Sequence, residues 1–336
     1  MTLQDIARVL NISHTTVSRA LADSPKISAE TKLRVRNAVE QLGYVPSASA
    51  RMMRGARSSL VGLVIPDIQN DFYATVAKTI ADSLAAHSMQ LMLSVTDDDS
   101  DRELRELRTI LETRPVGIII VPTATPRAET VALLNNVATV QLVRIHSRFN
   151  AQAVVIDDHE GVRAATQHLL SYGHTRLAFI GGDTSLSTGR NRLAGFEDAL
   201  KQHGLAPAAI ALGSPRPEFA RHAVTSMMAA KNRPTGLVFG SAELTLGALQ
   251  ALRTLGLDWP RDVSVVGYHD PAWFELAAGG ITTVRLPVQY IAATATSVLL
   301  SRASEDHSDG GRSDAPVNVE FAPALVLRGS TAPWVG

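Results

Sequence analysis

The stretch that decides the fold is TLQDIARVLNISHTTVSRAL, residues 2–21. Its apolar residues at positions 3, 6, 7 and 10 recur at the spacing of one face of a short helix. Thr2 can cap this helix, and Asp5 stands where a capping box needs an acid. Asn11 can end it in the left-handed conformation, and Ser13 can cap a second helix. Two short helices joined by a tight turn form the helix-turn-helix pattern.

The second helix has apolar residues at 17, 20 and 21 and hydrogen-bonding side chains on its other face. A third helix is expected from Ser28 to Leu42, ended by Gly43. Residues 1–57 carry nine Lys and Arg against four Asp and Glu, whereas the rest carries 23 against 28. A basic module on an acidic body is typical of a nucleic-acid binder with a separate second function. The two short helices alone leave an ordinary, solvated helical hairpin open as the alternative.

Composition bounds the class of protein. A chain of 336 residues suggests two or three domains. The absence of cysteine from the sequence excludes disulfides, thiolate catalysis and cysteine-ligated zinc. We find no apolar run of membrane-spanning length and no signal peptide before the first helix, so we expect a cytoplasmic protein.

From residue 60 onward, short apolar runs alternate with helical patterns. We expect strands at 60–65, 89–95, 116–121, 139–143, 153–156, 177–180, 237–239 and 263–266. The helices between them include 73–87, 161–172, 189–203 and 243–255. Two such series predict an α/β body of two doubly wound parallel-sheet lobes, with ligand bound at the carboxyl ends of the strands. Residues 304–316 are polar and read as a surface loop.

These features together resemble the lactose-repressor family of bacterial transcription regulators (LacI/GalR type), over essentially the whole chain. The motifs that carry the resemblance are T-L-Q-D-I-A and S-x-x-T-V-S-R-A-L in residues 2–21, Gly43-Tyr44-x-Pro46 with Ala50-Arg51, Val61-Gly62, Pro66-Asp67-x-x-Asn70-x-Phe72, Asp157 before Gly161, Gly173-His174-x-Arg176, Arg192-Leu193-Ala194-Gly195-Phe196, Val265-Val266-Gly267-Tyr268 and Arg328-Gly329-Ser330-Thr331. Each motif is weak alone, but their order and intervals are specific.

The resemblance implies a domain plan. It places an all-α helix-turn-helix head at 1–45, a hinge helix or linker at 46–57 and an effector-binding body of periplasmic-binding-protein type at 58–330. The chain would cross between two lobes three times, with one lobe at about 58–157 and 286–316 and the other at about 158–285 and 317–330. A plain solvated linker is the alternative for residues 46–57.

For DNA, the resemblance lays the second helix in the major groove. Arg19 would contact guanine, and His14 and Thr15 would reach base edges. Phosphate contacts or caps are expected at Thr16, Ser18 and Tyr44. In the hinge, Ser47 stands where the family has Asn, Arg51 matches the family motif, and Met53 replaces the leucine that the family inserts into the minor groove. The DNA-bound unit would be a homodimer on a near-palindromic operator, associated with the nucleoid.

For the effector, the resemblance points to residues from both lobes. These are Asp67, Phe72 and Tyr73 from the first lobe and Thr188, Arg192, Ser241, His269 and Asp270 from the second. Ser241 and His269 stand where the family commonly has acceptors for sugar hydroxyls. With Arg192, and with Arg148 or Arg190 as a second cation, this substitution makes the cleft less acidic. We therefore expect a sugar acid or sugar phosphate as effector, with a neutral sugar as the runner-up.

Two other functions compete with a ligand-switched repressor. An α/β enzyme is disfavoured because we find no dinucleotide or phosphate-loop motif and no metal-ligand spacing among the histidines. The Asp97-Asp98-Asp99 run reads as a solvated loop. No catalytic residue, cofactor or metal is therefore expected. A solute-binding protein of periplasmic type without DNA function is disfavoured by the helix-turn-helix.

Overall fold

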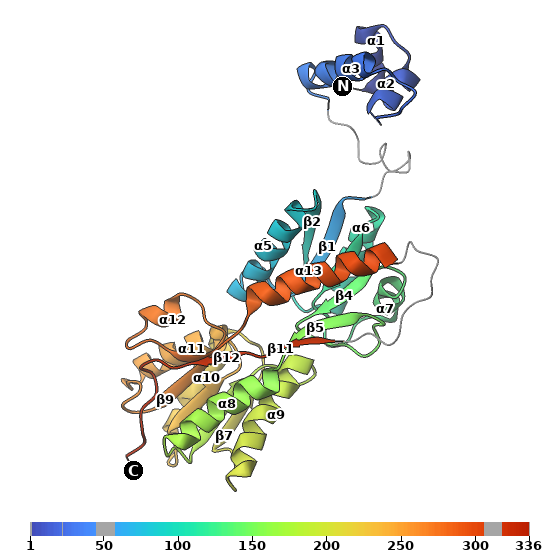
Figure 1. The fold of residues 1–336 in the computed structure, drawn as a ribbon. Coiled ribbons are helices and arrows are strands. Elements are labelled where there is room, and N and C mark those ends of the chain that lie inside the picture. Colours follow the sequence, from blue (N-terminus) through green and yellow to red (C-terminus); the bar gives the residue numbers. More distant parts are fainter. Residues whose placement is uncertain (1, 22, 45–57, 306–317, 336) are drawn as a thin grey trace. The chain divides into compact units, whose positions relative to one another are not determined.

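The computed structural model describes residues 2–21, 23–44, 58–305 and 318–335 and divides into two compact units, residues 1–58 and 59–336 (Figure 1). The predicted hinge helix at 46–57, with Ser47, Arg51 and Met53, lies outside the described residues, as does most of the loop at 304–316. Within the described ranges, we find no helix whose length and apolar character would let it cross a membrane.

The first unit is a head of three short helices. They are α1 (Leu3–Leu10), α2 (His14–Leu21) and α3 (Ala29–Gln41). Each helix contributes a fully buried side chain to their shared core: Ile6, Val17 and Val35. The predicted capping box between Thr2 and Asp5 is confirmed. The left-handed backbone that ends α1 at Asn11 and the Ser28 cap of α3 are confirmed as well.

The second unit begins with a six-stranded sheet in which all neighbouring strands are parallel. Its order is β11 (Val319–Phe321), β5 (Gln152–Ile156), β4 (Thr139–Leu142), β3 (Gly117–Ile120), β1 (Leu60–Ile65) and β2 (Gln90–Val95). Helices α5 (Asp71–Ala85) and α13 (Val288–Glu305) cover one face, and α6 (Ser100–Glu112) and α7 (Ala128–Leu134) cover the other. Strands buried on both faces explain the continuous apolar runs.

The second lobe repeats this architecture. Its sheet has the order β12 (Ala324–Val326), β10 (Thr282–Arg285), β9 (Ser264–Tyr268), β8 (Gly236–Phe239), β6 (Leu177–Gly181) and β7 (Ala209–Leu212), and only β12 is antiparallel among these described strands. Helices α8 (Asp158–Ser171) and α9 (Ser187–Gln202) lie on one face. Helices α10 (Pro217–Ala229) and α11 (Ala242–Thr254), with the short α12 (Trp273–Leu276), lie on the other. The predicted pair of doubly wound lobes is confirmed.

The chain crosses between the lobes after β5, after β10 and between β11 and β12. The sequence placed residues 317–330 in the second lobe, and this was wrong for residues 319–321. They form β11, which pairs with β5 in the first sheet, so the third crossing falls at residues 322–323. The hydrophobic pattern of a three-residue strand is too short to predict which sheet the strand joins.

Both sheets wind outward from a central first strand, so the connections reverse direction beside β1 and beside β6. In doubly wound folds, ligands bind outside the carboxyl ends of the strands at this reversal. The loops that follow β1 and β3 in the first sheet, and β6 and β8 in the second, are therefore where a binding site is expected.

We predict that Gly195 is required for the packing of α8 against α9. A Cβ at Gly195 would lie 2.2 Å from the carbonyl oxygen of His159. Gly195→Ala should lower the free energy of unfolding, measured in urea, by about 1–3 kcal/mol because the helices must separate. At Gly182, a Cβ would meet no described atom within 4 Å. Gly182→Ala should therefore change the free energy of unfolding by less than about 0.5 kcal/mol. Equal effects of the two substitutions would contradict this account.

Candidate functional site

A cleft opens among the carboxyl ends of the strands of both lobes. It encloses about 570 Å³, within the roughly 300–1,000 Å³ that is typical of small-molecule sites. Five of the predicted effector residues line it: Asp67, Tyr73, Thr188, Arg192 and Ser241. Phe72 and His269 line a smaller adjoining chamber that shares Tyr73, Arg192 and Ser241 with the cleft. The structure thus brings seven of the eight predicted residues together.

The floor of the cleft in the second lobe is a buried ion pair. Arg192 on α9 donates from Nε to Asp158 Oδ1 at 2.9 Å and from Nη1 to the Gly240 carbonyl at 2.7 Å. The Tyr268 hydroxyl donates to the same carboxylate oxygen, and the guanidinium carbon lies 4.1 Å from the centroid of the Tyr268 ring. The Asp158 side chain is only 2% exposed. These three side chains fix one another's positions.

This pairing leaves Arg192 charged and partly available. Burial lowers the pKa of Arg192, but the Asp158 carboxylate and the Tyr268 side chain together outweigh burial, so the net shift is upward. A guanidinium has five N–H donors, and the bonds to Asp158 and Gly240 use only two of them, while the side chain lines the cleft. Arg192 can therefore donate hydrogen bonds to a ligand although the Asp158 carboxylate neutralises its charge.

The first lobe presents a second arginine that the sequence reasoning missed. Arg144, just after β4, pairs with both carboxylate oxygens of Asp98, Nη2 lying 3.1 Å from Oδ2, and donates to the Pro122 carbonyl at 3.2 Å. The Arg144 side chain is 9% exposed, and Arg144 and Asp98 both line the cleft. Asp97, Asp98 and Asp99 are exposed in the turn after β2, as the sequence predicted, and Asp98 in addition pairs with Arg144. The position of Arg144 directly after a buried strand was the available signal.

The two arginines expected as the second cation lie elsewhere. Arg148 donates to the Pro126 carbonyl at 3.4 Å and Arg190 to the Thr184 carbonyl at 3.3 Å, and neither contributes to the described cleft lining. The cations that do line it are Arg144, Arg192 and the exposed Arg216. The inference of a second cation in the cleft holds, but for other residues.

Acidic groups outnumber the arginines along the cleft. The lining carboxylates are Asp67, Asp97, Asp98, Asp183 and Glu243. Burial raises the pKa of Glu243, and the nearby Asp71 and Asp67 raise it further. Arg144 is paired with Asp98, Arg192 with Asp158, and Asp97 with Arg102 outside the lining, which leaves three lining acids, Asp67, Asp183 and Glu243, against the single cation Arg216.

The smaller chamber is walled by aromatic rings from the two lobes. The Phe72 ring meets the His269 ring edge-on, with centroids 5.7 Å apart at 81°, and meets Tyr73 in the same way at 5.2 Å. Phe72 also packs in the core of the first lobe. Burial raises the pKa of Tyr73 and lowers the pKa of His269, so both side chains are neutral near pH 7. No described residue bonds the buried Nδ1 of His269.

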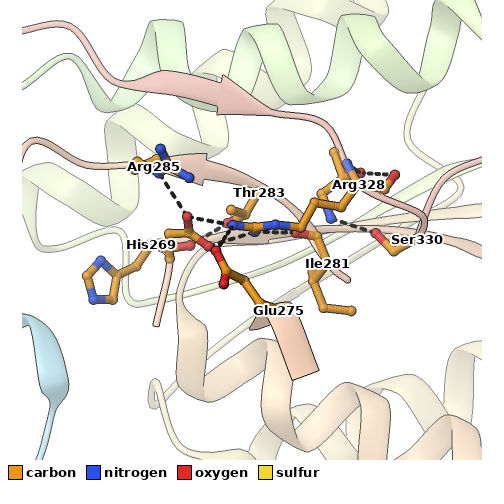
Figure 2. A network of polar contacts seen from close by, with 9 residues as sticks. His269, Glu275, Ile281, Thr283, Arg285, Arg328 and Ser330 are labelled. Carbon is orange, nitrogen blue, oxygen red and sulfur yellow. Dashed lines mark hydrogen bonds and ion pairs between the residues drawn. The ribbon is translucent and has the colours of Figure 1, made fainter. Parts of the chain in front are cut away.

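The structure corrects the expectation for Asp270. Its carboxylate accepts from Arg285 Nε at 2.8 Å and from Arg328 Nη1 and Nη2 at 2.7 and 3.0 Å, as Figure 2 shows for this cluster. Asp270 is thus held by arginines away from the described lining of the cleft and of the chamber. The preceding His269 has a left-handed backbone, φ 72°, which costs a non-glycine residue about 1–3 kcal/mol.

In the head, the predicted base-reading side chains lie on the exposed face of α2. His14, Thr15 and Arg19 are exposed. Thr16 and Ser18 are half-buried, and the Thr16 backbone N–H donates to Ser13 Oγ at 3.0 Å, which caps the helix. Tyr44 is half-buried and packs against the core of the head.

A small helical head with an exposed polar helix, joined in one chain to a two-lobed body with a ligand-sized cleft, defines a ligand-responsive DNA-binding regulator. The family model for the lacI family of bacterial regulatory proteins matches residues 2–47, and a periplasmic binding protein-like domain matches residues 166–331. The HTH-type transcriptional regulator DegA of Bacillus subtilis is 30% identical over 344 residues, covering 99% of this chain and 98% of that protein.

Two further similarities agree. The HTH-type transcriptional regulator GalR of Escherichia coli is 28% identical over 335 residues, covering 98% of this chain and 96% of that protein. A structure of the Lac repressor dimer bound to operator and the anti-inducer ONPF matches with a TM-score of 0.85 at 23% identity, covering 99% of both chains. The chain belongs to the lacI family of bacterial transcription regulators. The expectation of a regulator, and not an enzyme, is confirmed by these relatives.

We predict that the Arg192–Asp158 pair stabilises the second lobe. Arg192→Leu should lower the free energy of unfolding in urea by about 3–5 kcal/mol, because it leaves the Asp158 carboxylate buried and unpaired. Arg163→Leu is the matched control, since Arg163 pairs with Glu160 at 2.6 Å near the surface of α8, and it should cost no more than about 1 kcal/mol. Adding Asp158→Asn to Arg192→Leu should recover part of the loss. A similar cost for both single variants would show that the buried pair is dispensable.

Proposed function

We propose that this protein is a transcriptional repressor that binds a near-palindromic operator as a homodimer and releases or tightens on it when a small effector enters the cleft. The observation that carries the proposal is that groups from both lobes face one ligand-sized volume. A ligand that contacts both lobes binds one lobe arrangement better than another, so it shifts the equilibrium between them. The Lac repressor structure, a dimer on operator, supports the assembly.

In this proposal, α2 reads the operator. Arg19 has the fork of donors that matches guanine O6 and N7, and His14 and Thr15 reach neighbouring base edges. Thr16, Ser18 and Tyr44 contact phosphates and position the head. Ser47, Arg51 and Met53 form the hinge, with Met53 as the wedge in the minor groove.

For the effector, the cleft supports a neutral, hydroxyl-rich molecule such as a sugar better than a sugar acid or sugar phosphate. The lining carboxylates outnumber the arginines, and Arg144 and Arg192 are each neutralised by a carboxylate. A ligand with a negative charge would meet repulsion that these paired arginines do not offset. Neutral hydroxyl groups can bond to both the acids and the remaining guanidinium donors, while Phe72 and Tyr73 cover an apolar face.

Effector and operator affinities are then coupled. By linkage, the factor by which effector changes operator affinity equals the factor by which operator changes effector affinity. Titration of effector into free protein and into the protein–operator complex measures both sides of this equality.

We predict that Arg19→Ala relaxes base specificity. With an operator selected from random DNA by the wild-type protein, Arg19→Ala should weaken binding by about 1–3 kcal/mol, or roughly 5- to 150-fold, and lose discrimination at one base pair. Fluorescence anisotropy at fixed salt measures this. Arg36 on α3 is exposed and lies 3.6 Å from Asp23, so Arg36→Ala should weaken all sequences alike. If Arg19→Ala also reduced binding uniformly, Arg19 would be a phosphate contact.

We predict that neutral sugars stabilise the protein more than their acids do. Thermal unfolding and calorimetric titration with D-galactose and D-glucose, each against its aldonic acid and its 6-phosphate, compare the two classes. Binding at 100 times the dissociation constant should add about 2.7 kcal/mol of stability. Arg190 provides the control, because it lies outside the cleft lining and Arg190→Ala should leave the affinity for neutral sugars unchanged. A stronger response to the acids, lost in Arg216→Ala, would restore the acidic effector.

A further inference from the structure

The orientation of His269 depends on contacts made behind it. His269 follows β9, and its backbone N–H donates to the Val284 carbonyl at 2.9 Å. The Thr283 hydroxyl donates to the His269 carbonyl. Both partners lie on β10, so the left-handed turn at His269 is tied to the neighbouring strand.

The next residue, Asp270, joins the ends of three strands. Its carboxylate accepts hydrogen bonds from Arg285, the last residue of β10, and from Arg328, which follows β12. Arg328 is itself fixed, because it also donates to the Ile281 carbonyl at 2.9 Å and to Glu275 at 3.2 Å and is only 12% exposed. The two arginines outweigh burial, which acts in the opposite direction, and keep the pKa of Asp270 below its ordinary value.

A glycine makes room for this cluster. Gly280 has φ +73°, and a Cβ there would lie 2.7 Å from Cδ of Arg328. The Arg328 side chain can therefore run past residue 280 to reach Asp270. In Figure 2, the side chains of Arg285 and Arg328 extend toward one another, and the His269 ring points away from them.

We propose that Asp270 is a positioning residue for the effector site: its ion pairs with Arg285 and Arg328 hold the backbone turn that directs the His269 imidazole into the chamber beside Phe72. The proposal rests on effector binding in the cleft, as proposed above. Asp270 itself does not touch the effector. Because Arg285 directly precedes the crossing into the first lobe, the same ion pairs tie the turn at His269 to that crossing.

The titration of the His269 ring separates positioning from a simple charge effect. Burial lowers the pKa of His269, Asp71 and Asp270 raise it, and Arg192 lowers it. Asp270→Asn removes a charge that raises the pKa, so charge alone predicts a further fall. Loss of positioning predicts the opposite, a rise toward 6.5, because the ring leaves its buried place and regains water.

The experiment uses the full chain labelled with 13C at histidine Cε1, and the His269 signal is assigned by its loss in His269→Gln. We expect the His269 pKa to rise in Asp270→Asn and to stay unchanged in Glu275→Gln, the control that removes another carboxylate from Arg328 without touching Asp270. If Asp270→Asn fails to fold by circular dichroism, Arg285→Gln removes one arm of the cluster at a half-exposed side chain. An unchanged or lower pKa would overturn the proposal.

Ligand binding provides a second readout. Affinity for D-galactose or D-galactonate, whichever binds the wild type, should fall about tenfold in Asp270→Asn and not in Glu275→Gln. Unaltered affinity in a folded Asp270→Asn variant would count against positioning. If neither sugar binds the wild type, the proposed effector class fails, whereas the titration still decides the role of Asp270.

Discussion

A charge removed from water must be paired, and this constraint organises the ligand-facing floor of the body. Asp158 begins α8 immediately after the first crossing between the lobes, Arg192 projects from α9 and Tyr268 ends β9. Their mutual contacts connect two helices and a strand beneath one surface. The cost of leaving either charge alone keeps this surface in place, and the remaining donors of Arg192 are presented from a rigid base.

Most of the fold could be predicted from hydrophobic patterns, because the central strands are buried on both faces and the helices carry clear caps. Predicted and observed bounds differ by one or two residues for most elements. Four of the described strands, β7, β10, β11 and β12, escaped prediction, and two of them show the physical reasons. In β7, only alternate residues are shielded, as at a sheet edge. In β10, Thr282 and Thr283 are fully buried although polar, because their hydroxyls bond to the Arg328 and His269 carbonyls.

The site was less predictable because its charges find partners far along the chain. The family resemblance pointed to Arg192 and to four other residues of the cleft lining. It could not reveal that Arg144 pairs with Asp98, 46 residues away, or that Asp270 is taken up by Arg328, 58 residues away. From sequence alone, a carboxylate beside a binding motif is predicted to contact the ligand. Only the folded structure shows that another side chain is its partner. The proposed effector class rests on the first of these pairings, since Arg144 and Asp98 line the cleft, and on the pairing of Arg192 with Asp158.

The strand exchange near the carboxyl terminus means that neither lobe is a continuous piece of chain. Each sheet is completed by three late residues, β11 in one and β12 in the other, separated by two residues. During synthesis, which proceeds from the amino terminus, both sheets must wait with an unpaired edge until this segment leaves the ribosome. The head, by contrast, is local and can fold as soon as it emerges. The two lobes therefore complete their folding together, and recombination cannot exchange one lobe as a single continuous segment.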